Sequence, residues 1–338
     1  MKNFKFFLIA TVAFVLLVVL LQPLFIPKYI SAIRDGALIA EYYNSTKAHE
    51  VIFLGDCEVY ENISPVTLFE EYGITSYIRG GPQQLIWQSY YLLEDVFRYE
   101  SPRVVVFNVL AMKYGEPQSE PYNRLNLDGM SLSWSKLGAV RASMMEGEDL
   151  LSYLLPILRY HERWKELTQE DINYYFRQEI VGYNGFLMHT DVKPVTVIPE
   201  APRLTDYTLS ERCWEYLDKM RKLCGENNTE LVLIKAPTIW PPWYEQWEEQ
   251  IKAYAFKHGL KYINYLKRID DLGIDFNADT YDGGLHLNVY GAEKFSRGLG
   301  DYLIENFELN DYRNDPQIQA EWSVILARYN SEKEKEND

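Results

Sequence analysis

The sequence predicts an α/β protein built on a five-stranded parallel sheet, with one transmembrane helix before it. Between residues 51 and 306, short apolar runs alternate with amphipathic stretches of helical length. Such alternation is typical of a parallel sheet that is covered by helices on both faces. Ahead of this region, residues 6–26 contain no formal charge. The 338 residues leave ample material for a hydrophobic core.

Five strands are expected, at 51–54, 74–78, 104–107, 231–234 and 261–265, because these apolar runs are too short for helices. Ser64 and Pro65 form a typical helix start, and Gly73 is a typical stop. Further helices are expected at 84–99, 210–224, 245–257 and 290–306. Together these elements predict a three-layer, flavodoxin-like domain over residues 50–308.

Residues 112–202 interrupt the alternation. They are too long for a loop between consecutive strands, so we expect a helical insertion or cap, with helices at 150–163 and 169–177. Residues 27–49 are expected to form a polar stalk. Residues 309–338 are expected to form a short helix and a solvated, charged tail.

The segment 6–26 has 21 residues, which as a helix covers about 30 Å, the thickness of a bilayer's hydrocarbon core. A cleaved signal is the alternative, but its apolar run is normally shorter and ends at a small-x-small site. Lys2 and Lys5, in the 1–5 tail, favour a cytoplasmic N-terminus and an extracytoplasmic main domain. Lys28 and Arg34 weaken this asymmetry, so a cytoplasmic domain on the same anchor stays open.

Composition excludes several classes of protein. The net charge of −15 argues against a nucleic-acid partner, which needs clustered basic residues. Three cysteines are too few for a disulfide scaffold. Cys213 and Cys224 would lie about 16 Å apart on one helix, too far to pair, so both are expected in the core. No spacing indicates a metal site, and no cofactor is expected.

Polar and glycine residues follow the predicted strands, where ligands bind in wound sheets. They are Gly55, Asp56 and Cys57 after the first strand, Gly80 and Gly81 after the second, Asn108 after the third, and the segment around Trp240 after the fourth. Asp282 to His286 precede the last helix and are expected to face the same crevice.

These residues resemble the sequence blocks of the SGNH (GDSL-type) hydrolases. Phe53 to Cys57 is similar to the Gly-Asp-Ser block, Gly80 or Gly81 to the second block, Asn108 to the third, and Asp282 to His286 to the last. The resemblance spans residues 50–305 apart from the insertion. The anchor and the insertion also resemble those of membrane-bound family members that esterify cell-envelope polymers.

The resemblance implies a membrane-anchored acyl-ester hydrolase or O-acyltransferase acting on cell-envelope carbohydrate. Cys57 would be the nucleophile, His286 the base and Asp282 the residue that orients the ring. The amides of Cys57 and of Gly80 or Gly81, with Asn108, would form the oxyanion hole. A membrane acyl-donor protein is a possible partner.

Three departures from the family pattern leave an alternative open. Cysteine replaces serine at position 57, Asp282 lies four residues before His286 where the family has three, and Asn108 lacks the usual Gly-x-Asn-Asp surroundings. The alternative is a catalytically silent scaffold that binds an envelope polymer or a membrane partner. A thioesterase-like or redox role for Cys57 is a third possibility if the domain is cytoplasmic.

Trp240, Trp243 and Arg79 are the predicted substrate-binding residues. The two indoles offer flat surfaces to a sugar ring, and the guanidinium offers positive charge to an anionic substrate. Each has a structural alternative, which is core packing for the tryptophans and pairing with a carboxylate for Arg79.

Overall fold

The computed structural model describes residues 2–27, 35–46, 48–177 and 180–335, and it confirms the predicted fold class. The sheet contains β1 (Val51–Gly55), β2 (Ser76–Gly80), β3 (Val104–Asn108), β4 (Glu230–Lys235) and β5 (Lys261–Asn264). All neighbouring strands are parallel, and their order is β2-β1-β3-β4-β5. This order is flavodoxin-like, and it places the carboxyl ends of all strands at one edge.

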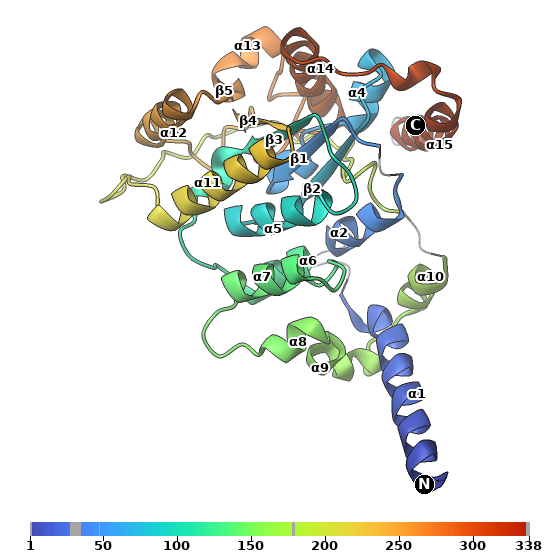
Figure 1. Ribbon diagram of the computed structural model, residues 1–338. Helices are drawn as coiled ribbons and strands as arrows, with labels where there is room; N and C mark the ends of the chain where they lie inside the picture. The colour runs from blue at the N-terminus through green and yellow to red at the C-terminus, as the bar shows by residue number, and fades with distance from the viewer. Residues whose placement is uncertain (1, 28–34, 47, 178–179, 336–338) are drawn as a thin grey trace.

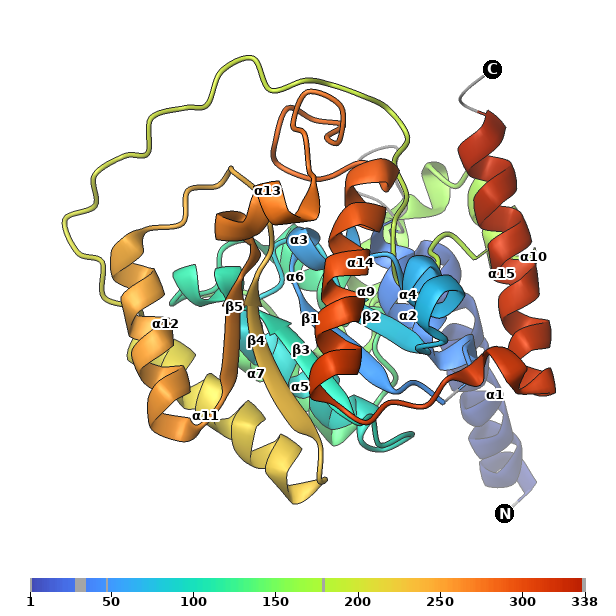
Figure 2. The same ribbon diagram turned by 90° about the horizontal axis from the view of Figure 1, so that it is seen from above.

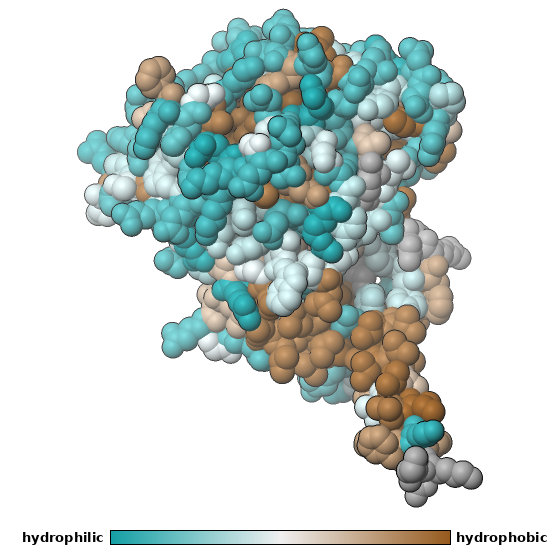
Figure 3. Space-filling model, in the orientation of Figure 1, coloured by the Kyte–Doolittle hydropathy of each residue, from teal (hydrophilic) through white to brown (hydrophobic). Residues whose placement is uncertain are grey.

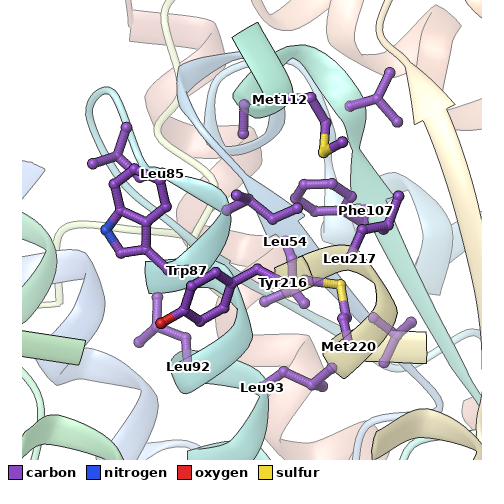
Figure 4. Packing of buried hydrophobic residues seen from close by; sticks show 14 of the residues in the cluster. Leu54, Leu85, Trp87, Leu92, Leu93, Phe107, Met112, Tyr216, Leu217 and Met220 are labelled. Atoms are coloured by element: carbon purple, nitrogen blue, oxygen red, sulfur yellow. The ribbon is translucent and has the colours of Figure 1, made fainter. Parts of the chain in front are cut away.

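The strands are buried on both faces because their apolar residues alternate between two cores. One core packs beneath α5 (Ile86–Val96), α11 (Glu211–Glu226) and α12 (Glu245–His258), as Figure 4 shows around Leu54 and Phe107. The other packs beneath α4 (Pro65–Tyr72) and α14 (Val289–Asn306). The first core receives strand residues Ile52, Leu54, Val105, Phe107, Leu231 and Leu233, and the second receives Val51, Phe53, Val104, Val106, Val232 and Ile234.

Local signals explain where the helices begin and end. The Ser64 hydroxyl accepts a hydrogen bond from the Thr67 amide at 3.2 Å, and Pro65 follows at the first helical position. Gly73 ends the helix with φ +70°. The remaining short elements of the body are α3 (Cys57–Tyr60), η3 (Val109–Lys113), η5 (Tyr265–Arg268), α13 (Ile269–Leu272) and η6 (Tyr312–Asn314).

The insertion contains more helices than the sequence predicts. Its elements are α6 (Glu120–Leu127), α7 (Trp134–Ser143), α8 (Leu150–Leu154), α9 (Ile157–Tyr160), η4 (His161–Lys165) and α10 (Gln169–Arg177). The expected helix at 150–163 is broken at Pro156, which cannot donate a helical hydrogen bond. From residue 180 to residue 210 the chain contains no helix or strand, and Figure 2 shows this segment arching over the sheet's carboxyl edge.

The N-terminal helix α1 (Lys2–Phe25) projects from the body (Figure 1). Its residues Phe4–Phe25 are long and apolar enough to cross a membrane, and they are not buried by the rest of the chain. A single span and a signal sequence both have this character.

The flanks of the domain differ from the prediction in two respects, the packing of the expected stalk and the length of the last helix. Residues 35–44 form η1 (Asp35–Ala37), α2 (Leu38–Glu41) and η2 (Tyr42–Asn44), which pack into the body instead of forming a free stalk; residues 28–34 and 47 lie outside the described ones. The C-terminal helix α15 (Pro316–Lys335) is long, and Trp322 stacks on Phe69 at 4.4 Å. Its buried residues Ile318, Trp322 and Tyr329 fill the second core, whereas residues 331–335, the described part of the expected charged tail, are helical and mostly exposed.

Candidate functional site

The first part of the candidate site is the turn after β1. A side chain at Gly55 would meet the Val59 side chain at 2.4 Å, so only glycine lets the strand turn directly into α3. The Asp56 carboxylate accepts a hydrogen bond from the Glu58 amide at 3.2 Å and caps this single turn. Cys57 is its first residue and is half-buried at the carboxyl edge of the sheet.

The second part is the loop that precedes α14. Gly283 and Gly284 have φ +87° and +101°, conformations that favour glycine. The Thr280 hydroxyl donates to the His286 carbonyl at 2.8 Å and accepts from the Gly284 amide at 2.8 Å. This fold of the loop accommodates the spacing of four positions between the acid and the imidazole: Asp282 Oδ2 lies 2.7 Å from His286 Nδ1, and Oδ1 accepts the His286 amide at 2.9 Å.

Cys57 and His286 meet, although they lie at opposite ends of the domain sequence. The His286 ring lies close enough to the thiol for each group to perturb the pKa of the other. The order sulfur, imidazole and carboxylate is the arrangement that an activated nucleophile requires.

A second carboxylate, which the sequence analysis did not identify, also faces the ring. Glu61 Oε2 lies 3.1 Å from His286 Nδ1, and it accepts the Tyr281 hydroxyl. Glu61 follows Cys57 by four residues around one helical turn, and this spacing was the available signal. Burial opposes protonation of His286, but Cys57, Glu61 and Asp282 outweigh it and raise the His286 pKa well above its usual value.

The same surroundings disfavour the thiolate. Burial raises the pKa of Cys57 to about 11; the nearby His286 opposes the rise, whereas Asp56 and Glu61 add to it. The site therefore disfavours the thiolate, while Asp282 and Glu61 favour protonation of the His286 ring.

His189, from the insertion, completes the surroundings of the site. Its ring stacks on Tyr281 at 3.8 Å between centroids, and burial lowers its pKa. Nε2 of His189 is buried and has no hydrogen-bond partner among the described residues. The amide of Val289 donates to the His189 carbonyl at 2.7 Å, which ties the insertion to the start of α14. The sequence analysis gave this histidine no chemical role.

Asn108, predicted for the oxyanion hole, already has partners. Its Nδ2 donates to Glu58 Oε2 at 2.9 Å and its Oδ1 accepts the Ala236 amide at 3.2 Å. Glu58 in turn pairs with Lys235 at 2.8 Å, with both side chains fully buried. The Thr238 hydroxyl also donates to Glu58. This buried network supports the turn that carries Cys57.

Arg79 does not reach the crevice. It pairs in register with Leu54, which faces the first core, so the alternation of the strand directs Arg79 to that side. The buried guanidinium lies 4.2 Å from the Tyr42 ring centroid and 3.5 Å from the Asp95 carboxylate. The predicted substrate contact is therefore wrong for this residue, and pairing with a carboxylate is what the structure shows.

The other predicted residues lie around the carboxyl edge. Gly80 pairs in register with Gly55, and a side chain at Gly81 would meet Asn126 Oδ1 at 2.2 Å. Trp240 and Trp243 are both half-buried, and the Trp243 indole donates to Glu248 at 2.8 Å. Ile239, which precedes Trp240, lies against Gly284 of the His286 loop, because a side chain at Gly284 would meet it at 2.9 Å.

In the described part of the chain, no group of three or more His, Cys, Asp or Glu side chains is arranged to hold a metal ion. A cavity of about 800 Å³ lies away from Cys57, lined by residues of α1, α2, α10 and α15. No protein-family model matches the chain, and no curated protein matches it. The fold and the side-chain geometry are therefore the basis for any functional assignment.

Proposed function

We propose that this protein is a membrane-anchored, SGNH-like acyl-ester hydrolase or O-acyltransferase that acts on cell-envelope carbohydrate. The observation that carries the proposal is the meeting of Cys57, from the turn after β1, with Asp282 and His286, from the loop before α14, at the carboxyl edge of the sheet. Nucleophile, base and orienting acid in hydrogen-bond contact are what acyl transfer needs.

In the proposed reaction the Cys57 sulfur attacks an ester carbonyl while Nε2 of a neutral His286 takes the thiol proton. The bond between sulfur and the acyl carbon forms, the ester C–O bond breaks, and the imidazolium returns its proton to the leaving alcohol. Water or a sugar hydroxyl then attacks the thioester, His286 accepts its proton, and the thiol is restored. Asp282 stabilises the ring orientation throughout.

Oxyanion stabilisation falls to the backbone amides of Cys57 and of Gly80 or Gly81 in this proposal. Asn108 would join them only by giving up its bond to Glu58, which leaves that carboxylate with Lys235 and Thr238 as partners. The half-buried Trp240 is the candidate platform for a sugar ring.

The anchor belongs to the same proposal. With α1 retained as a span, the short N-terminal tail carrying Lys2 and Lys5 would stay in the cytoplasm and the body would lie outside. A membrane protein that supplies the acyl group would then reach Cys57 on the extracytoplasmic side. The intact mass of the mature protein distinguishes a retained span from a cleaved signal. Labelling of Cys57 in intact cells by a membrane-impermeant thiol reagent tests the orientation.

The decisive experiment is trapping of an acyl group from an activated ester, followed by mass spectrometry of the Cys57 peptide. We expect an adduct on the wild type and on Cys213→Ala, and none on Cys57→Ala. The wild-type adduct should be released by neutral hydroxylamine because it is a thioester. Equal labelling of Cys57→Ala and Cys213→Ala would overturn the assignment.

A catalytically silent scaffold that binds an envelope polymer or a membrane partner is the second candidate. Two observations favour it: the raised pKa of Cys57 and the engagement of Asn108 by Glu58. It predicts that no acyl adduct forms at any pH at which the protein is folded, whereas binding of the polymer persists in Cys57→Ala.

A further inference from the structure

The insertion exposes large apolar side chains on the side of the body from which α1 leaves. They lie on α8, α9, η4 and α10 and nearby turns, and Trp164 and Phe176 expose 64% and 77% of their surface. In Figure 3 apolar side chains gather at the base of the body and continue onto α1. We call the following residues the basal apolar surface: Leu151, Leu155, Leu158, Trp164, Ile172 and Phe176.

This surface is attached to the end of the apolar helix. Arg163 donates to the Phe25 carbonyl at 2.8 Å, and the Tyr175 hydroxyl donates to the Leu20 carbonyl at 2.9 Å. The elements α9, η4 and α10 all contact α1, and Figure 1 shows them beside its upper part. The insertion therefore meets α1 over its last turns, and the basal apolar surface is continuous with the candidate span.

The contacts set the height of the insertion relative to a bilayer. A helix over Phe4–Phe25 covers about 33 Å, so one end of the hydrocarbon core falls near Phe25 when the other falls near Phe4. Leu20 then lies about 8 Å inside that boundary. Amphipathic helices that lie on membranes immerse their apolar face by about 5–10 Å, the same depth.

We propose that the insertion is an interfacial membrane platform, which lies in the lipid–water boundary of the bilayer that α1 spans and immerses the basal apolar surface in it. The occupant is lipid. Basic Arg159, Arg163 and Lys165 alternate with acidic Glu162 and Glu166, so the contact does not depend on anionic headgroups. The proposal rests on α1 remaining as an anchor and is independent of the chemistry at Cys57.

The platform fixes the body against the membrane at two places, the span and the insertion. The insertion also continues through residues 181–189 along the edge of β2, where the Asn184 carbonyl accepts the Ile78 amide at 2.9 Å, to His189 beside the candidate site. If the insertion lies on the membrane, it would therefore fix the distance between the bilayer and the side of the candidate site that His189 covers.

The test uses the full-length protein in phosphatidylcholine vesicles whose acyl chains carry bromine either near the headgroup or near the chain end. Bromine quenches tryptophan fluorescence on contact. We expect Trp164→Phe to remove a component of the tryptophan fluorescence. In the wild type this component should be quenched more by bromine near the headgroup than by bromine near the chain end. Phe256→Trp is the matched control, because Phe256 is 93% exposed on α12, far from α1 in Figure 1, and should add fluorescence that neither lipid quenches.

A double variant, Leu158→Glu with Phe176→Glu, separates the platform from the anchor. It should abolish the quenching of Trp164 while the protein stays in the vesicles through α1. Quenched intensity that is the same in the wild type and in Trp164→Phe would overturn the proposal. So would protection of Trp164 by a second copy of the chain, seen as a crosslinked dimer that the double variant loses. Neither result would bear on acyl trapping at Cys57.

Discussion

The protonation of Cys57 offers a sharp test of how the candidate site works. Burial raises the pKa of the Cys57 thiol to about 11, against an ordinary value of 9.0. At pH 7 such a thiol carries about one thiolate in ten thousand molecules. We therefore expect alkylation of Cys57 by iodoacetamide to be slow at neutral pH and to rise until the pH approaches 11.

Glu61→Gln is the informative change, because it removes one negative charge and keeps an oxygen that can accept the Tyr281 hydroxyl. Glu61 adds to the raised pKa of Cys57, after burial and Asp56. Removing its charge should therefore lower the pKa of Cys57, while Asp282 still contacts the His286 ring at Nδ1.

The assay follows the alkylation rate of the Cys57 peptide against pH by mass spectrometry. Cys213 and Cys224 are buried in the first core, so their alkylation marks the pH at which the protein unfolds. Glu332→Gln is the matched control, because Glu332 also accepts a tyrosine hydroxyl but lies on the C-terminal helix. A wild-type midpoint below pH 8, or equal midpoints in Glu61→Gln and the wild type, would refute this account of the site.

Three further predictions concern stability. Lys235→Met leaves Glu58 buried without its cation and should lower the free energy of unfolding, measured by urea titration, by about 3–5 kcal/mol. Adding Glu58→Gln should recover part of this loss. If the double variant instead loses the sum of the two single losses, the pairing is not what stabilises these residues. Trp322→Ala removes the stack on Phe69 and should lower the free energy of unfolding by about 3–5 kcal/mol in the same titration. A loss below about 1 kcal/mol would mean that the packing of α15 does not stabilise the domain. The pKa of His286 is raised in the folded protein, so the stability that comes from its protonation is fully present below about pH 6.5 and is lost as the pH rises through the folded-state pKa. His286→Gln should therefore make the thermal midpoint fall less steeply at alkaline pH. An equally steep fall in this variant would contradict the prediction.

The fold could be predicted because burial on both faces imposes a pattern on short strands. The runs at 51–54, 104–107 and 231–234 are apolar at every position, and each is a strand within one residue at either end. The second strand was placed two residues too early, because Ile74 is apolar and buried but belongs to the turn after α4. The helix α7 was not predicted and α15 was expected to be short, since neither has a strong amphipathic pattern and their burial comes from tertiary contacts.

The candidate site was predictable only where its residues are neighbours in sequence. Asp282 and His286 share one loop, so their pairing could be expected. The two glycines between them let the loop bring the carboxylate to the ring although the spacing is one residue longer than in the family pattern. The pairing of Lys235 with Glu58 depends on two strands and a turn meeting in space, which no local pattern encodes. Arg79 shows the converse error, since a charge at a strand end indicates nothing about which face it takes until the register is known.

The charges around Cys57 also bear on why a cysteine occupies this position. A thiol normally reacts as a thiolate, yet Asp56, Glu61 and burial all raise its pKa. These charges oppose formation of the thiolate, so attack requires the Cys57 proton to pass to a neutral His286. A substrate or partner that covered the site with positive charge, or that displaced the Glu61 carboxylate from the ring, would release that proton. Under the proposed acyl transfer, occupation of the site would therefore favour the reactive thiolate.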